Sequence, residues 1–261
     1  MQDNTTIETE KLGSHEPTFI INEYSTAADA SVAAMDHLTA RAGQLVQGHL
    51  SQTSRRWQFA TTSLVEALVE VSVSVEVDKA KLKLGEGTDT QRPVDPPHVK
   101  EIMEYFVDRV SEDKPYWFGQ LAFNLPAGES VTLFTVNNSA PVRQAQMVIP
   151  RSTKMLPVDG NHRLSAFEKL QVAAREGDPT WDALKEDAIQ WCLIDEPNPE
   201  IARQLFKDAG SAKPLPQALL VGFGAFDIFP SVVKRIALDT PVFKGRIDYL
   251  SKSLGDRRAH V

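Results

Sequence analysis

Residues 156–170 read LPVDGNHRLSAFEKL, in which the end of an apolar strand passes through a short polar turn into an amphipathic helix. Gly160 permits such a tight turn, because glycine adopts backbone conformations that other residues avoid. Further strand and helix patterns alternate through the second half of the chain. This junction and the alternation around it predict an α/β or α+β fold.

Periodic apolar residues give the positions of the other elements. We expect helices at 27–50, 99–110, 164–174, 199–209 and 230–238. We expect strands at 18–21, 116–125, 130–136, 145–149 and 188–194, and also at 69–77, where apolar and polar residues alternate. Ser25 or Thr26 is the expected cap of the first helix, and the Gly- and Pro-rich stretch 85–97 is the best internal break.

The turn at 159–163 carries the residues with the clearest chemistry. The first N–H groups of the following helix point into the turn, and the helix dipole favours an anion there. His162 and Arg163 add donors at the same end, and a guanidinium matches the oxygens of phosphate. Asp159 can accept a proton, bind a divalent cation or cap the helix. A phosphate site and an ordinary Asp-Gly-Asn turn with a helix cap are both consistent with these residues.

The segment VDGNHRLSAF resembles the DGQHR motif of the DndB-like proteins of bacterial DNA phosphorothioation clusters, with Asn161 in place of Gln. It is more distantly similar to the phosphate-binding turn of the ParB and sulfiredoxin superfamily, which is often Gly-x-His-Arg. Other stretches also resemble the DndB-like family, namely Gln91-Arg92 with the helix at 98–105, 206–208 with 212–214, and 242–248. The resemblance therefore covers roughly residues 90 to 250.

The resemblance implies a ParB/sulfiredoxin-like mixed-sheet core with flanking helices. It divides the chain into an N-terminal extension, 1–90, to which we assign no fold, and a DGQHR domain at 91–261 that is shortened at its C-terminus. It implies a nucleotide or phosphate site made by Gly160, Asn161, His162, Arg163 and Arg92. Asp159 is the candidate catalytic residue, and ATP or CTP with a divalent cation is the expected ligand.

The function that the resemblance implies is DNA sulfur modification, with this chain as a DNA-binding transcriptional regulator of the modification cluster. The expected partners are DNA and other sulfur-modification proteins. Two alternatives stay open. One is a ParB-like nucleotide hydrolase or phosphotransferase that uses the same turn, and the other is a nonenzymatic remnant that binds a partner protein.

Charge restricts how such a chain contacts DNA. Twenty-eight Lys and Arg against 35 Asp and Glu give a net charge of −7, so a DNA contact needs a local basic patch. Candidate patches are Arg55-Arg56-Trp57 and the basic residues of 244–258. No stretch approaches the roughly 18 apolar residues that span a bilayer, and the polar N-terminus lacks the pattern of a secretory signal. We therefore expect a cytoplasmic protein with no membrane contact.

The remaining candidates favour structural roles. The single cysteine, Cys192, excludes an intrachain disulfide, and its apolar strand predicts a buried, unreactive thiol. Sulfiredoxin-like chemistry needs a cysteine in the turn, where this chain has Asn161. The six histidines lack zinc-site spacing, so no metal site is expected. Glu168 faces either solvent or the site, depending on the register of its helix.

Overall fold

The computed structural model describes residues 18–53, 55–75 and 94–198, together with scattered positions between 201 and 242. The chain divides into two compact units, Met1–Gly210 and Ser211–Val261. The fold described below is that of the first unit. Among the described residues, no helix is both long and apolar enough to cross a membrane.

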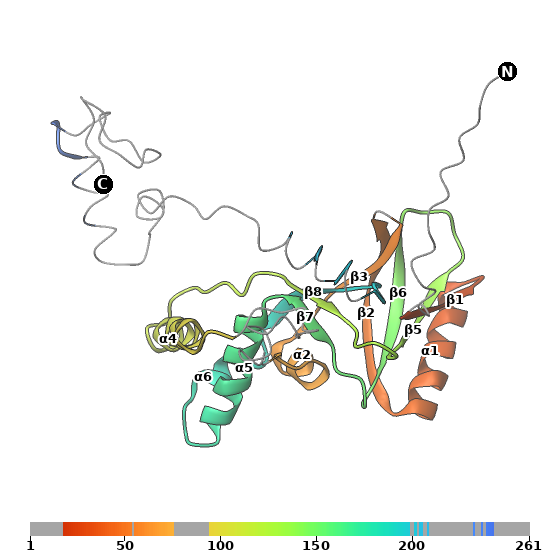
Figure 1. Cartoon of the computed structure of the whole chain (residues 1–261), viewed down its shortest axis with the longest axis horizontal. Coiled ribbons are helices and arrows are strands. Elements are labelled where there is room, and N and C mark those ends of the chain that lie inside the picture. Colours follow the sequence, from red (N-terminus) through yellow and green to blue (C-terminus); the bar gives the residue numbers. More distant parts are fainter. Residues whose placement is uncertain are drawn as a thin grey trace, which may run out of the picture. The chain divides into compact units, whose positions relative to one another are not determined.

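The first unit is built on one mixed β-sheet, shown in Figure 1. Its eight described strands lie in the order β1-β5-β6-β2-β3-β8-β4-β7. The β1–β5 and β4–β8 pairs are parallel, and the other neighbours are antiparallel. The strands are β1 (Phe19–Tyr24), β2 (Gly43–Thr53), β3 (Arg56–Leu64), β4 (Leu121–Asn124), β5 (Val131–Val136), β6 (Val142–Pro150), β7 (Leu156–Asp159) and β8 (Ala188–Ile194). The predicted α/β class is confirmed.

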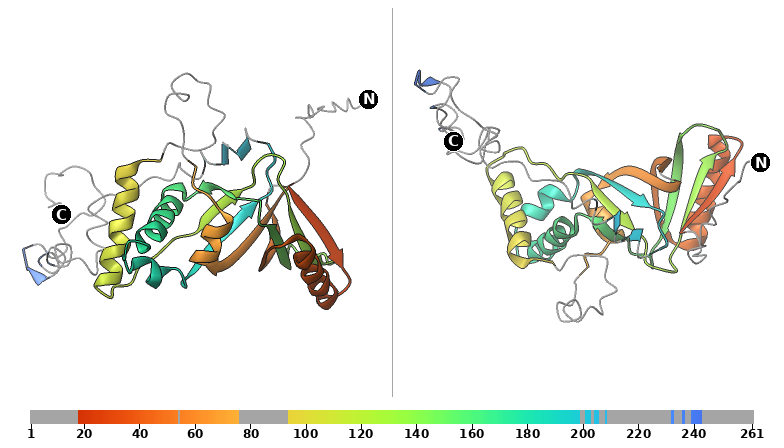
Figure 2. Two further views of the ribbon diagram at one scale, coloured as in Figure 1. Left: turned by 90° about the horizontal axis from the view of Figure 1, so that it is seen from below. Right: turned by 45° about the horizontal axis from the view of Figure 1, so that its top comes forward.

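The described helices form two groups near opposite ends of the sheet (Figure 2). They are α1 (Ala27–Arg41), α2 (Val65–Val71), α4 (Pro96–Ser111), α5 (Asn161–Ala174) and α6 (Thr180–Leu184). α1 packs on β1, β2, β5 and β6. α4, α5 and α6 pack on one another, and α5 also contacts α2 and β7. The second group therefore surrounds the junction between β7 and α5.

Each helix group has its own buried apolar cluster. The cluster under α1 is small and consists of Ala30, Ala34, Phe134 and Val148. The larger cluster includes the rings of Phe106, Phe118 and Phe167, whose centroids lie 5.5–5.6 Å apart. These rings join α4, the segment before β4, and α5. Burial of three phenylalanine side chains contributes roughly 2 kcal/mol each, so the corner where α5 begins is firmly held.

Several predicted elements are confirmed. The helix expected at 99–110 is α4, and the strand expected at 188–194 is β8 with the same bounds. The strand expected at 130–136 is β5. Thr26 caps α1, because its side-chain oxygen accepts a hydrogen bond from the Asp29 amide.

Two predicted elements are wrong. The helix expected at 27–50 ends at Arg41, and β2 follows from Gly43 because it pairs with both β6 and β3, so sheet pairing outweighs the continuing helical periodicity. The strand expected at 69–77 is replaced up to Val71 by α2. There Val65, Leu68 and Val69 are buried at i, i+3 and i+4, a helical spacing that the alternating valines hid.

The sheet contains strands from both sides of residue 90, where the sequence predicts a domain boundary. β1, β2 and β3 precede that position, yet each pairs with a strand that follows it. Residue 90 therefore lies within the first unit, and the division into an N-terminal extension and a DGQHR domain stays a prediction. β4 and β5, which form within the strands expected at 116–125 and 130–136, are not neighbours in the sheet, because β4 lies between β8 and β7 while β5 lies between β1 and β6.

Candidate functional site

The turn between β7 and α5 is built on Gly160. Its φ is +94°, in the left-handed region, and it forms the N-cap of α5 without a side-chain capping bond. A Cβ atom at this position would lie 2.7 Å from Cδ2 of Leu121, so the turn also packs directly on β4. Only glycine satisfies both the conformation and the close approach. The result is a helix N-terminus whose first amides are not covered by a capping side chain.

Arg163 fixes this turn to the segment before β4. Its Nη1 donates to the carbonyl oxygens of Phe118, at 2.9 Å, and Gln120, at 3.0 Å, and its Nη2 donates to Oδ2 of Asp159 at 2.8 Å. Gly119 makes room for the guanidinium, because a Cβ there would lie 2.6 Å from Nη1. Three of the five N–H donors of Arg163 are thus used by the chain itself. Its phosphate-binding role stays a prediction, and its clamping role is what the structure shows.

Asn161 and His162 hold two further chain segments against the first turn of α5. The buried Asn161 side chain accepts from the amide of Val75 at 2.9 Å and donates to the carbonyl of Val75 at 3.0 Å. Nε2 of His162 accepts from the amide of Asp95 at 3.1 Å, so in the neutral ring the proton sits on Nδ1. The ring of His98 packs edge-on against His162 with centroids 5.1 Å apart. Both side chains therefore organise the backbone around the turn.

Glu168, one turn further along α5, faces the same region and not open solvent. Its carboxylate accepts from the backbone amide of Ser74 at 2.8 Å and from the Ser74 hydroxyl. Together with Asn161 it fixes the backbone at residues 74 and 75. Arg92, the remaining residue predicted for the site, lies outside the described residues.

Cys192 lies on the same rung of the sheet as Asp159, with Ala122 of β4 paired to both residues. Burial, and then the charge of Asp159, raise the pKa of the Cys192 thiol to about 11. A thiol with so high a pKa is protonated at neutral pH and is a poor nucleophile. This agrees with the prediction of an unreactive cysteine.

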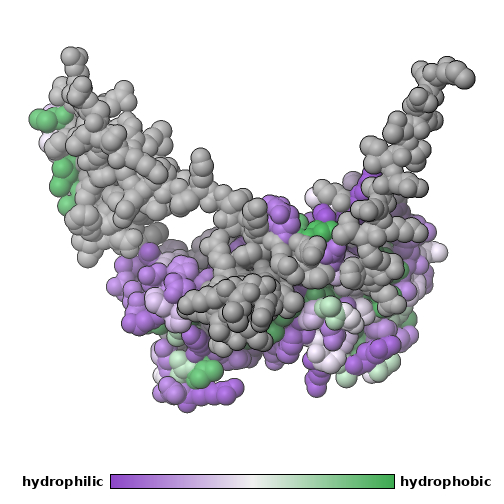
Figure 3. Space-filling view, in the orientation of Figure 1, coloured by the Kyte–Doolittle hydropathy of each residue, from purple (hydrophilic) through white to green (hydrophobic). Residues whose placement is uncertain are grey.

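An exposed indole and a cavity lie beside the clamp. Trp117 is 77% exposed, and a Cβ on Gly119 would lie 3.8 Å from its Nε1 and 2.6 Å from Nη1 of Arg163. A cavity of about 340 Å³ is lined by Thr62, residues 116–119 and residues 187–190. Most described residues visible in Figure 3 are hydrophilic, with smaller hydrophobic areas between them. The sequence prediction missed Trp117 because it placed 116–125 in a strand. The glycine that ends the run Tyr116-Trp117-Phe118-Gly119 was the signal for a turn before the strand.

The start of α5 is suited to binding an anion and provides few ligands for a cation. The bare helix N-terminus and the positive charge of Arg163 attract an anion, whereas the half-exposed carboxylate of Asp159 opposes it. In the part of the chain that the structure describes, no group of three or more His, Cys, Asp or Glu side chains is placed to hold a metal ion. A divalent cation bound with a nucleotide would therefore have Asp159 and the phosphates as its ligands at this turn.

The candidate patch at residues 55–57 is also engaged in internal contacts. Arg56 forms an ion pair with the buried carboxylate of Glu196. The guanidinium of Arg143 stacks over the ring of Trp57 at 5.0 Å from its centroid. Arg55 is exposed, with a left-handed φ of +65°. Trp57 and Arg56 thus stabilise the end of β3, and Arg55 is the basic side chain of this patch that faces solvent.

A family model described as DndB, DNA-sulfur modification-associated, matches residues 52–261. The match begins before the expected boundary at residue 91, so it includes β3 and α2 as well as the 159–163 turn. No curated protein and no solved structure matches the chain. The expected similarity to the ParB and sulfiredoxin fold therefore stays a prediction.

Proposed function

Because the chain belongs to the DndB family of DNA-sulfur modification-associated proteins, we propose that it is a DNA-binding transcriptional regulator of the modification gene cluster, with a nucleotide phosphate bound at residues 159–163. Family membership associates the chain with DNA sulfur modification. The regulatory role, the nucleotide and the DNA contact are the proposal. ATP or CTP, with a divalent cation, is the proposed ligand.

The bare N-terminus of α5 is the observation that carries the phosphate site. The helix has 14 residues, its N-cap is Gly160, and no side chain caps it. The side chains of Asn161, His162 and Arg163 are all bonded to other backbone groups, so they hold the turn in place. A phosphate would therefore be bound chiefly by backbone amides and the helix dipole, with Arg163 adding charge. Such a site needs the motif residues for its shape more than for direct contact.

Replacing Asp159 with asparagine tests this site. The amide oxygen can still accept from Arg163, so the turn is kept while a negative charge beside the ligand is removed. In a titration without a divalent cation, we expect ATP or CTP to bind about fivefold more tightly to Asp159→Asn than to the wild type, because the repulsion removed is about 1 kcal/mol at an exposed site. Calorimetry measures the affinity.

Asp182→Asn is the matched control, since Asp182 is also an exposed carboxylate that is paired to a cation, Lys185 at the C-cap of α6. It should leave nucleotide affinity unchanged. If Asp159 is catalytic, Asp159→Asn loses turnover while it keeps binding, which favours the hydrolase. If the wild type binds neither ATP nor CTP, the nucleotide site is refuted and the nonenzymatic alternative gains support.

The charge difference between the two units supports the DNA contact. Residues 211–261 carry eight Lys and Arg against four Asp and no Glu, a net +4, although the whole chain is at −7. The other 210 residues therefore carry −11. Phosphate neutralisation drives most nonspecific DNA binding, so the second unit is the expected DNA-contacting part.

Removal of two basic residues from the second unit tests this assignment. Arg257→Ala with Arg258→Ala should lower the slope of log affinity against log salt by about two on the promoter DNA of the chain's own gene cluster. Lys100→Ala with Arg175→Ala, which removes two exposed cations from the first unit, should leave the slope unchanged. A wild-type affinity that does not change with salt concentration contradicts a phosphate-led contact.

A further inference from the structure

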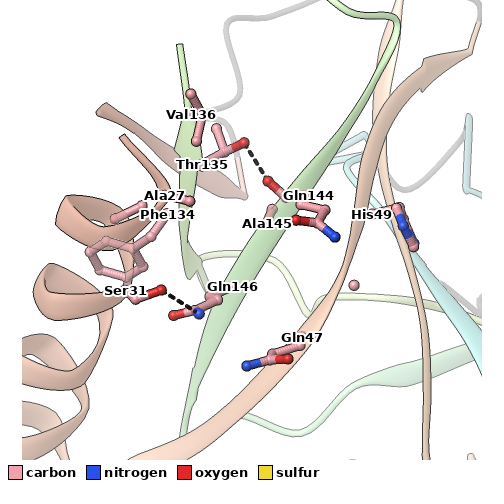
Figure 4. A pocket seen from close by; sticks show the side chains of 12 residues that line it. Ala27, Ser31, Gln47, His49, Phe134, Thr135, Val136, Gln144, Ala145 and Gln146 are labelled. Carbon is pink, nitrogen blue, oxygen red and sulfur yellow. Dashed lines mark hydrogen bonds between the residues drawn. The ribbon is translucent and has the colours of Figure 1, made fainter. Parts of the chain in front are cut away.

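We propose a second binding site, for a nucleobase, in a pocket beside α1 (Figure 4). The pocket has a volume of about 300 Å³ and lies over β5, β6 and β2, next to the first turns of α1. β7, which leads into the 159–163 turn, is at the far edge of the same sheet. The pocket is therefore separate from the proposed phosphate site, and this inference does not rest on that proposal.

The strand register places a set of polar side chains on the pocket floor. Phe134 of β5 pairs with Gln146 of β6, which pairs with Gln47 of β2. On the next rung of this face, Gln144 pairs with His49. Figure 4 shows these side chains projecting from neighbouring strands into the same region. Three glutamine amides and one imidazole thus line one side of the pocket.

Gln146 has a polar atom for which the described structure supplies no partner. Its Nε2 donates to Oγ of Ser31 on α1 at 2.9 Å, while its Oε1 is buried without a hydrogen bond from any described residue. If the amide oxygen and nitrogen were exchanged, the nitrogen would be the unpaired atom, so the deficit persists in either orientation. A buried polar atom without a partner is costly, and a ligand that supplies the missing hydrogen bond removes that cost.

The chemistry of the lining selects a neutral, planar ligand. Among the described residues that line the pocket, none is Lys, Arg, Asp or Glu, so a phosphate finds no countercharge there. Gln47 and Gln144 are exposed, and each amide presents a donor beside an acceptor. The exposed ring of His49 offers a flat surface for stacking.

These features fit a nucleobase, and adenine in particular. A glutamine amide pairs in two places with adenine, where its oxygen accepts from N6 and its nitrogen donates to N7. The N6 amino group also supplies the donor that Oε1 of Gln146 lacks. The volume is at the lower end for ligand pockets, which suits one base with its sugar. The base could belong to a free nucleoside or to an unpaired position of a DNA strand.

Calorimetric titration of the whole chain with adenosine tests the site, because adenosine carries no phosphate and so does not probe the 159–163 turn. We expect saturable binding that weakens about tenfold in Gln146→Leu, the cost of one lost hydrogen bond. Gln47→Ala, which changes an exposed side chain and should not disturb folding, should weaken binding similarly. Gln44→Leu is the matched control, since Gln44 also has a buried amide oxygen without a described partner but lies outside the pocket.

The two sources of the base are distinguished by a second titration, with a single-stranded adenine oligonucleotide. Binding of adenosine that depends on Gln47 and Gln146 supports a nucleoside site. Binding of the oligonucleotide alone, with the same dependence, supports a base presented by a strand. The proposal is overturned if neither ligand binds, or if Gln47→Ala binds both as tightly as the wild type does.

Discussion

Arg163→Ala should lower the free energy of unfolding by about 4 kcal/mol. The substitution leaves the carbonyl oxygens of Phe118 and Gln120 without their charged donor and Asp159 without its ion-pair partner. Hydrogen bonds to charged groups contribute roughly 1.5–3 kcal/mol each, and this clamp includes two to backbone oxygens. The measurement is the shift of the urea midpoint, with an unchanged slope confirming that both proteins unfold alike.

Arg175→Ala is the control for this prediction, because Arg175 is an exposed arginine at the other end of α5. It should cost about 0.5 kcal/mol or less. Arg163→Lys keeps the charge but not the planar fork, so it should recover less than half of the loss. Equal destabilisation by Arg163→Ala and Arg175→Ala would show that the clamp contributes nothing to stability. For nucleotide binding, Asp159→Asn is the better probe, since loss of Arg163 disturbs the whole turn.

Gly160→Ala should cost about 3 kcal/mol, for two independent reasons. An alanine at a φ of +94° is strained, which alone costs roughly 1–2 kcal/mol. Its Cβ would also lie 2.7 Å from Cδ2 of Leu121, a side chain that is fully buried and has little room to move. Thermal and urea unfolding would both record the loss.

Gly177→Ala separates these two reasons. Gly177 has a φ of +97°, close to that of Gly160, yet a Cβ there would meet nothing within 4 Å. Its cost should be the backbone strain alone, about 1 kcal/mol. The difference between the two variants measures the contact with Leu121. A Gly160→Ala protein that is no less stable than Gly177→Ala would refute the proposed packing of the turn on β4.

Elements with strong local patterns could be predicted from the sequence. The one-sided apolar spacing of residues 99–110 indicated α4, and the apolar run at 188–194 indicated β8. The strand–turn–helix junction at Gly160 was also correct, because a glycine between an apolar strand and an amphipathic helix has few alternatives. β2 was missed since its strand character comes from its two neighbours in the sheet and not from its own residues.

The partners of the motif residues could not be predicted either, because these partners are also distant in the sequence. Arg163 donates to backbone oxygens that lie 45 and 43 positions away, and Asn161 bonds to Val75, 86 positions away. Backbone acceptors leave no pattern in the side-chain sequence. The motif therefore suggested a set of side chains aimed at a ligand, whereas the structure shows most of them binding the chain itself.

The sheet order also has a consequence for how the protein is made. Ser63 of β3 and Trp191 of β8 are hydrogen-bonded neighbours, although 128 residues separate them in the chain. At a translation rate of about 5–20 residues per second, the β8-facing edge of β3 waits roughly 6 to 26 seconds for its partner to emerge from the ribosome. Throughout that interval the nascent polypeptide presents an open strand edge, the kind of surface to which holding chaperones and neighbouring nascent chains bind.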